Sequence, residues 1–154
     1  MLKKKFTLLI FLFLTSCGYE AIHSKKNAVL YNFSINALSL TGDRDVNLKI
    51  KEKLHNYTLD EKDKNFTVKV DSVSNKIILG KDLSGDPTSF KITITITVET
   101  LTANNTKINL ELVESFNYNN ISNKFNLKKY ERRIKRNLAE SATNKIIFKL
   151  SNIQ

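Results

Sequence analysis

The sequence of 154 residues has no tryptophan, one cysteine, one proline, two histidines and four glycines. A single cysteine has no partner for an intrachain disulfide, and neither His23 nor His55 has a second His or Cys at metal-ligand spacing. The glycines form no phosphate-binding loop, and no Ser or Asp is paired with a base in a catalytic pattern. We therefore expect neither enzyme activity nor a metal ion or other cofactor.

The chain also lacks an apolar run long enough to cross a membrane. Its main apolar run, Phe6 to Leu14, has nine residues, which as a helix covers about half of a hydrocarbon core about 30 Å thick. Three lysines, Lys3 to Lys5, precede this run, and small residues follow it. A charged start, a short apolar stretch and a small-residue boundary are typical of a secretory leader. The sequence predicts export, with residues 1–16 as the signal peptide.

The only cysteine, Cys17, stands directly at the end of this leader. The stretch Leu14-Thr15-Ser16-Cys17 resembles a bacterial lipobox, in which the thiol receives a diacylglycerol before cleavage. Several acyl chains on one residue hold a protein at a bilayer far more firmly than one chain does. The alternative is a chance cysteine in an ordinary leader. Gly18 stands where an aspartate would favour inner-membrane retention, so by resemblance to enterobacterial sorting we expect an outer-membrane protein, with the polar residues 17–27 as its tether.

The chain is strongly basic, with 25 Lys and Arg against 15 Asp and Glu. Loss of the three leader lysines leaves 22 basic residues and a net charge of +7. Such a charge favours anionic partners, although a chain rich in Lys, Asn and Ile also arises from a codon pool poor in G and C, with the lysines simply solvated. Arginine is scarce by contrast, and three of the four arginines are Arg132, Arg133 and Arg136.

The residues after the tether predict one small domain, 28–154. Residues 28–40 are β-prone, and Asp43 is placed to cap a short helix whose apolar residues recur at helical spacing. These residues are Val46, Ile50, Leu54 and Tyr57. Residues 65–73 resume a two-residue period, with apolar side chains on one face and polar ones on the other. The glycine- and proline-containing residues 80–89 then predict a turn.

The clearest alternation is "SFKITITITVETL", 89–101, in which apolar residues from Phe90 to Val98 alternate with Lys, Thr and Glu. This pattern predicts a long strand with one apolar face. After a turn at Asn104-Asn105, residues 107–119 return as its antiparallel partner. Glu114 interrupts the apolar phase of this second strand, and we expect a β-bulge near it.

A longer helix is expected over 128–151. Its apolar stripe comprises Tyr130, Ile134, Leu138, Ala142 and Ile146. Six cations occupy the opposite arc: Lys128, Lys129, Arg132, Arg133, Lys135 and Arg136. Four strands and two helices predict an α+β fold, a two-layer sandwich of a four-stranded, mainly antiparallel sheet with both helices on one face.

The leader ending in Cys17-Gly18-Tyr19, the capped helix, the long hairpin and the tail "SFNYNNISNKFNLKKYERRIKRNLAESATNKIIFKL" together resemble the LptE family of lipopolysaccharide-assembly lipoproteins. The resemblance implies a small two-layer domain that plugs an LptD-like outer-membrane β-barrel, helps the barrel assemble and assists insertion of lipopolysaccharide into the outer leaflet. The protein would then be lipid-anchored in the outer membrane, with its domain on the periplasmic side or within the barrel lumen. Of the family's functional positions, the resemblance carries over the lipidated residue, Cys17.

Lipopolysaccharide carries phosphates, which gives a basic domain near its route an electrostatic role. The candidate contacts are Lys81 in the turn and Lys128, Lys129, Arg132 and Arg133 at the start of the last helix. The alternative for these side chains is plain solvation. The alternative for the whole protein is an unrelated anchored lipoprotein that binds an anionic periplasmic lipid or polymer. We expect no nucleic-acid partner, because the aromatic residues follow the core phase rather than the basic arc.

Overall fold

The computed structural model describes residues 31–153. The signal peptide, Cys17, Gly18 and the tether therefore lie outside the described residues. The elements follow the order β1 (Ser34–Gly42), α2 (Arg44–Leu54), the 3-10 turn η2 (His55–Tyr57), β2 (Asn65–Lys81), β3 (Pro87–Thr102), β4 (Lys107–Asn119) and α3 (Lys124–Ser151).

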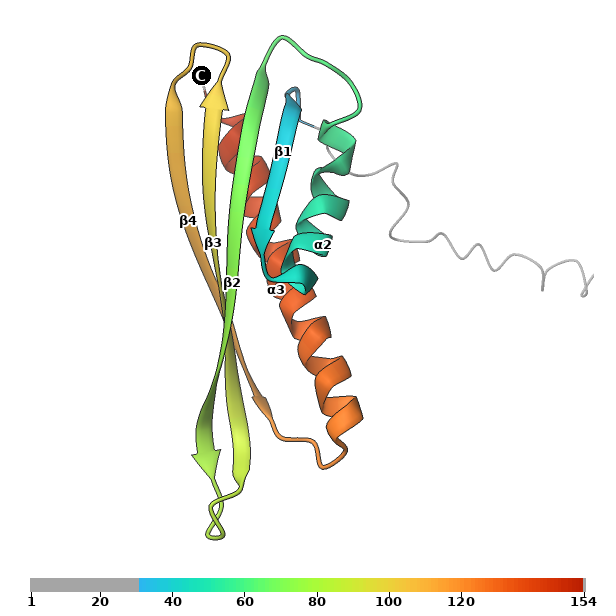
Figure 1. Ribbon diagram of the computed structural model, residues 1–154, viewed down its shortest axis with the longest axis vertical. Coiled ribbons are helices and arrows are strands. Elements are labelled where there is room, and N and C mark those ends of the chain that lie inside the picture. The colour runs from blue at the N-terminus through green and yellow to red at the C-terminus, as the bar shows by residue number, and fades with distance from the viewer. Residues whose placement is uncertain (1–30, 154) are drawn as a thin grey trace, which may run out of the picture. The chain divides into compact units, whose positions relative to one another are not determined.

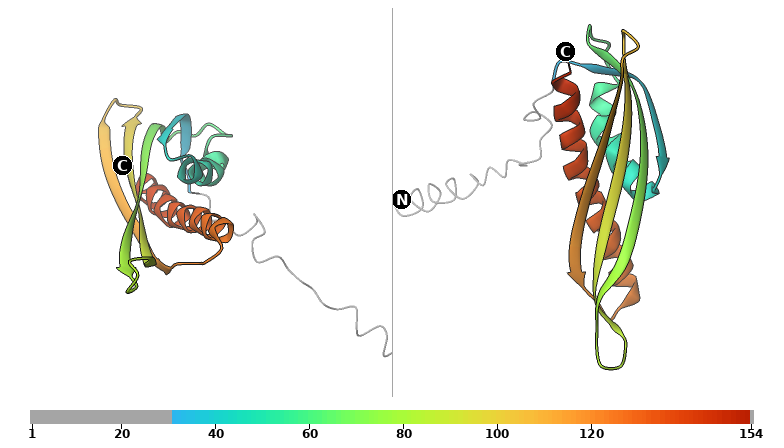
Figure 2. Two further views of the ribbon diagram at one scale, coloured as in Figure 1. Left: turned by 60° about the horizontal axis from the view of Figure 1, so that its bottom comes forward. Right: turned by 90° about the vertical axis from the view of Figure 1, so that its left-hand side faces the viewer.

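The four strands form one sheet in the order β1-β2-β3-β4. β1 runs parallel to β2 and is joined to it through α2, as a parallel pair requires a crossover connection. β2 with β3, and β3 with β4, are antiparallel. Both helices cover the same face of this sheet (Figure 1; Figure 2). The predicted class, an α+β two-layer sandwich with a mainly antiparallel sheet, is confirmed.

The core lies between the sheet and the two helices. Alternate residues of β3 are buried from Phe90 to Val98, and α2 contributes Val46, Ile50 and Leu54, as the sequence period predicts. On α3 the buried positions include Ile134, Ala142 and Ile146 of the predicted stripe. Leu138 and Tyr130 pack only partly buried against this core. The apolar faces that the sequence predicted for β3, α2 and α3 are therefore the faces that pack together in the core.

Two strand boundaries differ from the sequence expectation. β1 begins at Ser34 rather than earlier, because its partner β2 begins at Asn65 and offers no pairing before that residue. β2 continues to Lys81, well past the expected end near residue 73, because β3 pairs with it along this whole length. The predicted turn at 80–89 is correspondingly shorter, and a β-bulge interrupts the register between Ile78 and Gly80.

The prediction of a bulge at Glu114 is wrong. The register between β3 and β4 is unbroken, with Ile94 opposite Glu114. Glu114 keeps its place on the helix-facing side, and its carboxylate accepts a hydrogen bond of 2.6 Å from Nζ of Lys145 on α3. An acidic residue in the apolar phase is thus accommodated by an ion pair at the edge of the core.

α3 begins at Lys124, four residues before the expected start, because Asn123 caps it by accepting a hydrogen bond from the Asn126 amide. The expected start at Lys128 is therefore one turn late. The six cations from Lys128 to Arg136 therefore lie after the first turn of α3, away from the positive end of the helix dipole.

Candidate anion-binding surface

The placement of α2 and α3 depends on Asp43, the N-cap of α2. Its Oδ1 accepts hydrogen bonds from the amides of Asp45 and Val46 at 2.9 and 3.1 Å. Its Oδ2 accepts from the hydroxyl of Ser74 at 2.5 Å and from Nζ of Lys135 at 2.7 Å. Burial opposes the charge of Asp43, but the bonds from Lys135, Ser74 and Val46 outweigh it and lower its pKa. One carboxylate therefore joins α2, β2 and α3.

Further ion pairs bridge the two helices on their exposed side. Glu140 of α3 lies 2.7 Å from Nζ of Lys53 and 3.2 Å from Nζ of Lys49. Glu52 of α2 lies 3.2 Å from both Lys49 and Arg136. The hydrogen bond from Lys53 is the main reason that the pKa of Glu140 is lowered.

Beside these pairs lies an open depression of about 520 Å³ between α2 and the first half of α3. Five cations and two carboxylates line it, so its lining carries a net charge of +3. The charged lining residues are Asp45, Lys49, Lys129, Arg132, Arg133, Arg136 and Glu140. In the part of the chain that the structure describes, this is a concave surface where basic side chains outnumber acidic ones.

The cations of this depression are not equivalent. Lys49 and Arg136 are engaged by the carboxylates of Glu52 and Glu140. Among the ion pairs formed within residues 31–153, none includes Lys129, Arg132 or Arg133. The guanidinium of Arg133 lies 5.1 Å from the ring centre of Tyr130, a cation–π distance. Two arginine forks and one ammonium are thus available to oxyanions such as phosphate, which arginine can bind through two parallel hydrogen bonds.

Of the five cations that the sequence predicted as anion contacts, only some lie in this depression. Lys129, Arg132 and Arg133 come together in the depression. Lys128 is exposed on α3 outside this lining, and Lys81 is the last residue of β2, on the hairpin that leads to β3. The sequence analysis missed Lys49 as a member of the surface. Its position off the apolar stripe of α2 marks it as solvent-facing, but only the packing of α2 on α3 brings it to Arg132.

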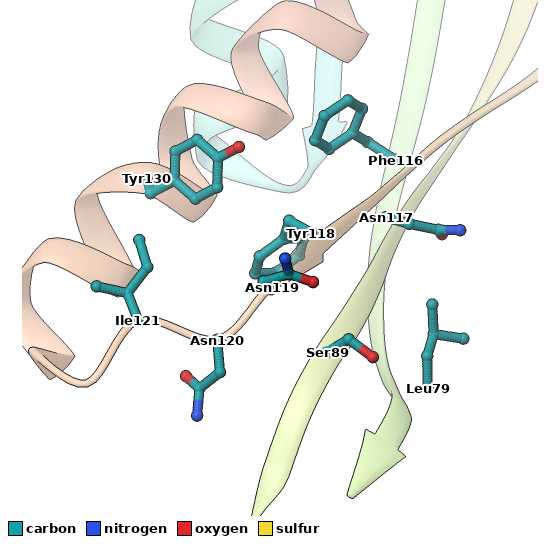
Figure 3. Close-up of a pocket in the computed structure, with 9 residues that line it drawn as sticks. All are labelled: Leu79, Ser89, Phe116, Asn117, Tyr118, Asn119, Asn120, Ile121 and Tyr130. Atoms are coloured by element: carbon teal, nitrogen blue, oxygen red, sulfur yellow. The ribbon is translucent and has the colours of Figure 1, made fainter.

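A second depression, of about 680 Å³, lies where β4 ends and the chain turns into α3. Figure 3 shows the rings of Phe116 and Tyr130 at this place, with the amides of Asn117 and Asn120 on the strand and the following turn. No charged side chain lines it. It therefore differs in chemistry from the cationic depression and holds none of the predicted site residues.

The ring of Tyr118 anchors the start of α3 near this second depression. Its hydroxyl donates a hydrogen bond of 2.7 Å to Glu131, which also pairs with Lys76 of β2 at 2.5 Å. Burial, together with the bond to Glu131, raises the pKa of Tyr118 above its usual range. The Lys76 amine lies 3.9 Å from the ring centre of Phe90. These contacts hold the part of α3 around Glu131, which carries the basic residues, against the sheet.

Between residues 31 and 153, no helix has both the length and the hydropathy of a membrane span. Over the same residues there is no group of three or more His, Cys, Asp or Glu side chains arranged to hold a metal ion.

The sequence matches no protein-family model and no curated protein. Its fold, however, is similar to solved structures of bacterial lipoproteins. The rare lipoprotein B of Shewanella oneidensis superposes with a TM-score of 0.59 at 10% identity, over 75% of this chain and 94% of that one. A minor lipoprotein of Acinetobacter baumannii gives 0.55 at 17% identity, over 79% and 92%. Lipoprotein B of Nitrosomonas europaea gives 0.54 at 12% identity, over 79% and 83%. The chain therefore shares the fold of these proteins across most of their length.

Proposed function

We propose that this protein is a lipid-anchored outer-membrane subunit of a lipopolysaccharide translocon of the LptE type. The observation that carries the proposal is the combination of two features. The folded domain has the architecture of three bacterial lipoproteins, and the sequence before it ends its apolar leader in Leu14-Thr15-Ser16-Cys17. A lipoprotein leader joined to a lipoprotein fold supports an anchored protein better than either feature alone.

In this proposal Cys17 carries the lipid, and the domain seats against or inside an LptD-like barrel. The domain helps the barrel assemble and assists lipopolysaccharide on its way to the outer leaflet. No enzyme chemistry is required for such a role, since a plug acts through binding. The resemblance of the leader, hairpin and tail to the LptE family supports the choice of this partner.

The cationic depression supports contact with lipopolysaccharide phosphates. Lys129, Arg132 and Arg133 would bind the phosphate oxygens, while Glu52 and Glu140 keep Lys49 and Arg136 in place. Charge-assisted hydrogen bonds of this kind are about twice as strong as neutral ones. Lys81 and Lys128 belong to the proposed basic surface outside the lining of the depression, where they attract the anion electrostatically without contacting it.

The same depression favours a second candidate, an anchored lipoprotein that binds another anionic periplasmic lipid or polymer without a barrel. The two candidates differ in their partner. Affinity purification of the full chain from solubilised outer membranes tests this directly. Recovery of an outer-membrane barrel protein in a constant ratio supports the translocon subunit, whereas recovery of the lipoprotein alone contradicts it and leaves the second candidate.

The anchor is tested separately with Cys17→Ser. Metabolic labelling with a radioactive fatty acid should mark the wild-type chain and not the variant, which should accumulate as uncleaved precursor because the thiol that accepts the lipid is absent. Label that persists in Cys17→Ser would overturn the anchor and, with it, the outer-membrane assignment.

A further inference from the structure

Asp45 of α2 brings an acidic group into the lining of the cationic depression, where it is partly buried. The other acidic residue of the lining, Glu140, is paired with Lys49 and Lys53. Among the ion pairs formed within residues 31–153, none includes Asp45. The depression therefore contains one carboxylate whose charge is not matched by a cation of the described chain.

A suitable lysine lies close to Asp45 in the sequence but pairs elsewhere. Lys49 follows Asp45 by one turn of α2, the spacing at which acidic and basic side chains can pair on a helix. The Lys49 amine lies instead 3.2 Å from both Glu52 and Glu140. A carboxylate in the first turn also favours the helix dipole, but Asp43 already caps this end of α2. The Asp45 carboxylate is thus available to a positive group in the depression.

The wall that α3 contributes carries the opposite charge. Lys129 lies three and four residues before Arg132 and Arg133, so the three side chains share one surface of the helix. All three are exposed, and none forms an ion pair within residues 31–153. The Tyr130 ring, 5.1 Å from the Arg133 guanidinium, helps to position this group. The depression therefore has an anion-binding wall on α3 and an unpaired acidic group on α2.

A simple phosphate does not match this arrangement. Its oxygens are attracted by the arginines of α3 and repelled by the Asp45 carboxylate of α2. A positive group beside the phosphate turns this repulsion into attraction, so Asp45 would select such a ligand and disfavour one without the positive group. The volume of about 520 Å³ lies in the usual range for pockets that bind small ligands.

We propose that the depression binds a phosphate ester that carries a primary ammonium group on a two-carbon linker, as phosphoethanolamine does. Lys129, Arg132 and Arg133 bind the phosphate oxygens, and Asp45 accepts hydrogen bonds from the ammonium group, which has only donors to offer. This inference rests on the anion site of the proposed function and specifies which phosphate groups that site prefers. A phospholipid headgroup and a soluble phosphoethanolamine ester share this chemistry.

Two pairs of matched probes test the role of the ammonium group. O-phosphoethanolamine and propyl phosphate differ only in an ammonium group where the second has a methyl group. Dihexanoylphosphatidylethanolamine and dihexanoylphosphatidylpropanol differ in the same way and add a lipid. Dissociation constants are measured at low salt by NMR titration of the isotope-labelled full chain in detergent. The ratio of the two constants within a pair removes effects that both members share.

Asp45→Asn should reverse the preference within each pair. We expect the dissociation constant of the ethanolamine compound to rise and that of the propyl compound to fall, each by about two- to fivefold, as for an exposed charge pair. Asp45→Glu keeps the carboxylate and should keep the wild-type preference. Asp60→Asn, the matched control, removes the same charge outside the lining and should leave the ratio unchanged. Thermal melts check that each variant is folded.

The outcomes separate this inference from the anion site itself. If both members of a pair bind and Asp45→Asn leaves their ratio as in wild type, the ammonium contact is wrong while the anion site stands. If the wild-type chain binds none of the four probes, the inference and the phosphate contact of the proposed function both fail. An Asp45-dependent ratio in the phospholipid pair alone supports a membrane lipid headgroup as the ligand, and the same ratio in both pairs shows that the phosphoethanolamine group is sufficient.

Discussion

Lys135 of α3 donates a hydrogen bond of 2.7 Å to Asp43, the residue that caps α2, although the two residues are 92 positions apart in the chain. The Asp43 side chain is only 15% exposed. A single carboxylate thus starts one helix and fixes the second helix beside it. The cationic depression lies between the same two helices, and this contact helps to fix their relative position.

Asp43 contributes stability in a pH-dependent manner. Because its pKa is lowered in the folded state, its contribution is present above the ordinary value of 3.8 and is lost as the pH falls through the lower folded value. We expect Asp43→Asn to be less stable than wild type at pH 7, with a smaller difference in the melting temperature at pH 2–3. Thermal melts of both proteins across this range provide the measurement. A difference that stays constant with pH would contradict the assigned ion pair.

Two glycines with positive φ angles should respond differently to alanine. A Cβ at Gly42, where φ is +96°, would lie 1.9 Å from the carbonyl oxygen of Ser72. Gly85 has a φ of +89°, but no atom lies within 4 Å of its added Cβ. Gly85→Ala should therefore cost only backbone strain, about 1–2 kcal/mol, and Gly42→Ala should cost clearly more because the β1–β2 contact must open. Equal losses in chemical denaturation would rule out the close approach at Gly42.

The core-facing sides assigned to β3 and α3 can be tested by placing a single charged residue on each. Ile94 in β3 is fully buried, and an aspartate there places an unpaired charge in the core at a cost of several kcal/mol, against a total stability of about 5–15 kcal/mol. Leu138→Asp should destabilise less, since Leu138 is only partly buried. Thr93→Asp, on the opposite face of the sheet from Ile94, is the control and should fold normally. Circular dichroism melts rank the three, and a wild-type melt for Ile94→Asp would refute the assigned face.

Charge reversal in the cationic depression should affect anion binding without affecting the stability of the fold. Lys129→Glu/Arg132→Glu/Arg133→Glu should abolish lipopolysaccharide binding while changing the free energy of unfolding little, because the three side chains are exposed and form no ion pair within residues 31–153, and even exposed ion pairs contribute only about 0–1 kcal/mol. Lys81→Glu/Lys128→Glu reverses charges outside the depression and should weaken binding only modestly. Wild-type binding should also fall as salt rises from low to physiological concentration.

These measurements pair a thermal melt with a lipopolysaccharide-binding titration for each variant. If the triple variant binds as wild type does, the depression is not the anion site. If instead Lys81→Glu/Lys128→Glu is the more damaging of the two, the contact surface is the hairpin and outer face of α3.

Much of the fold was predictable because burial on one face leaves a period in the sequence. The alternation from Phe90 to Val98 indicated a strand and identified its core face, and the helical spacing of Val46, Ile50 and Leu54 did the same for α2. Glu114 shows where this reasoning failed. A break in the apolar phase was interpreted as a bulge, but Lys145, 31 residues later, neutralises the charge within an unbroken register.

By itself, the sequence determined the fold class and the apolar faces of the strands and helices, and it placed Cys17 directly after a short apolar run. These features depend on residues that are neighbours in the chain, or on a period that repeats along it. Only the tertiary structure decided that Lys49 joins Arg132 and Arg133 in one depression, that Lys81 and Lys128 are not among its lining residues, and that β2 extends past β1. Each of these depends on how distant elements pack and on where a partner strand ends, and no local period records such distances.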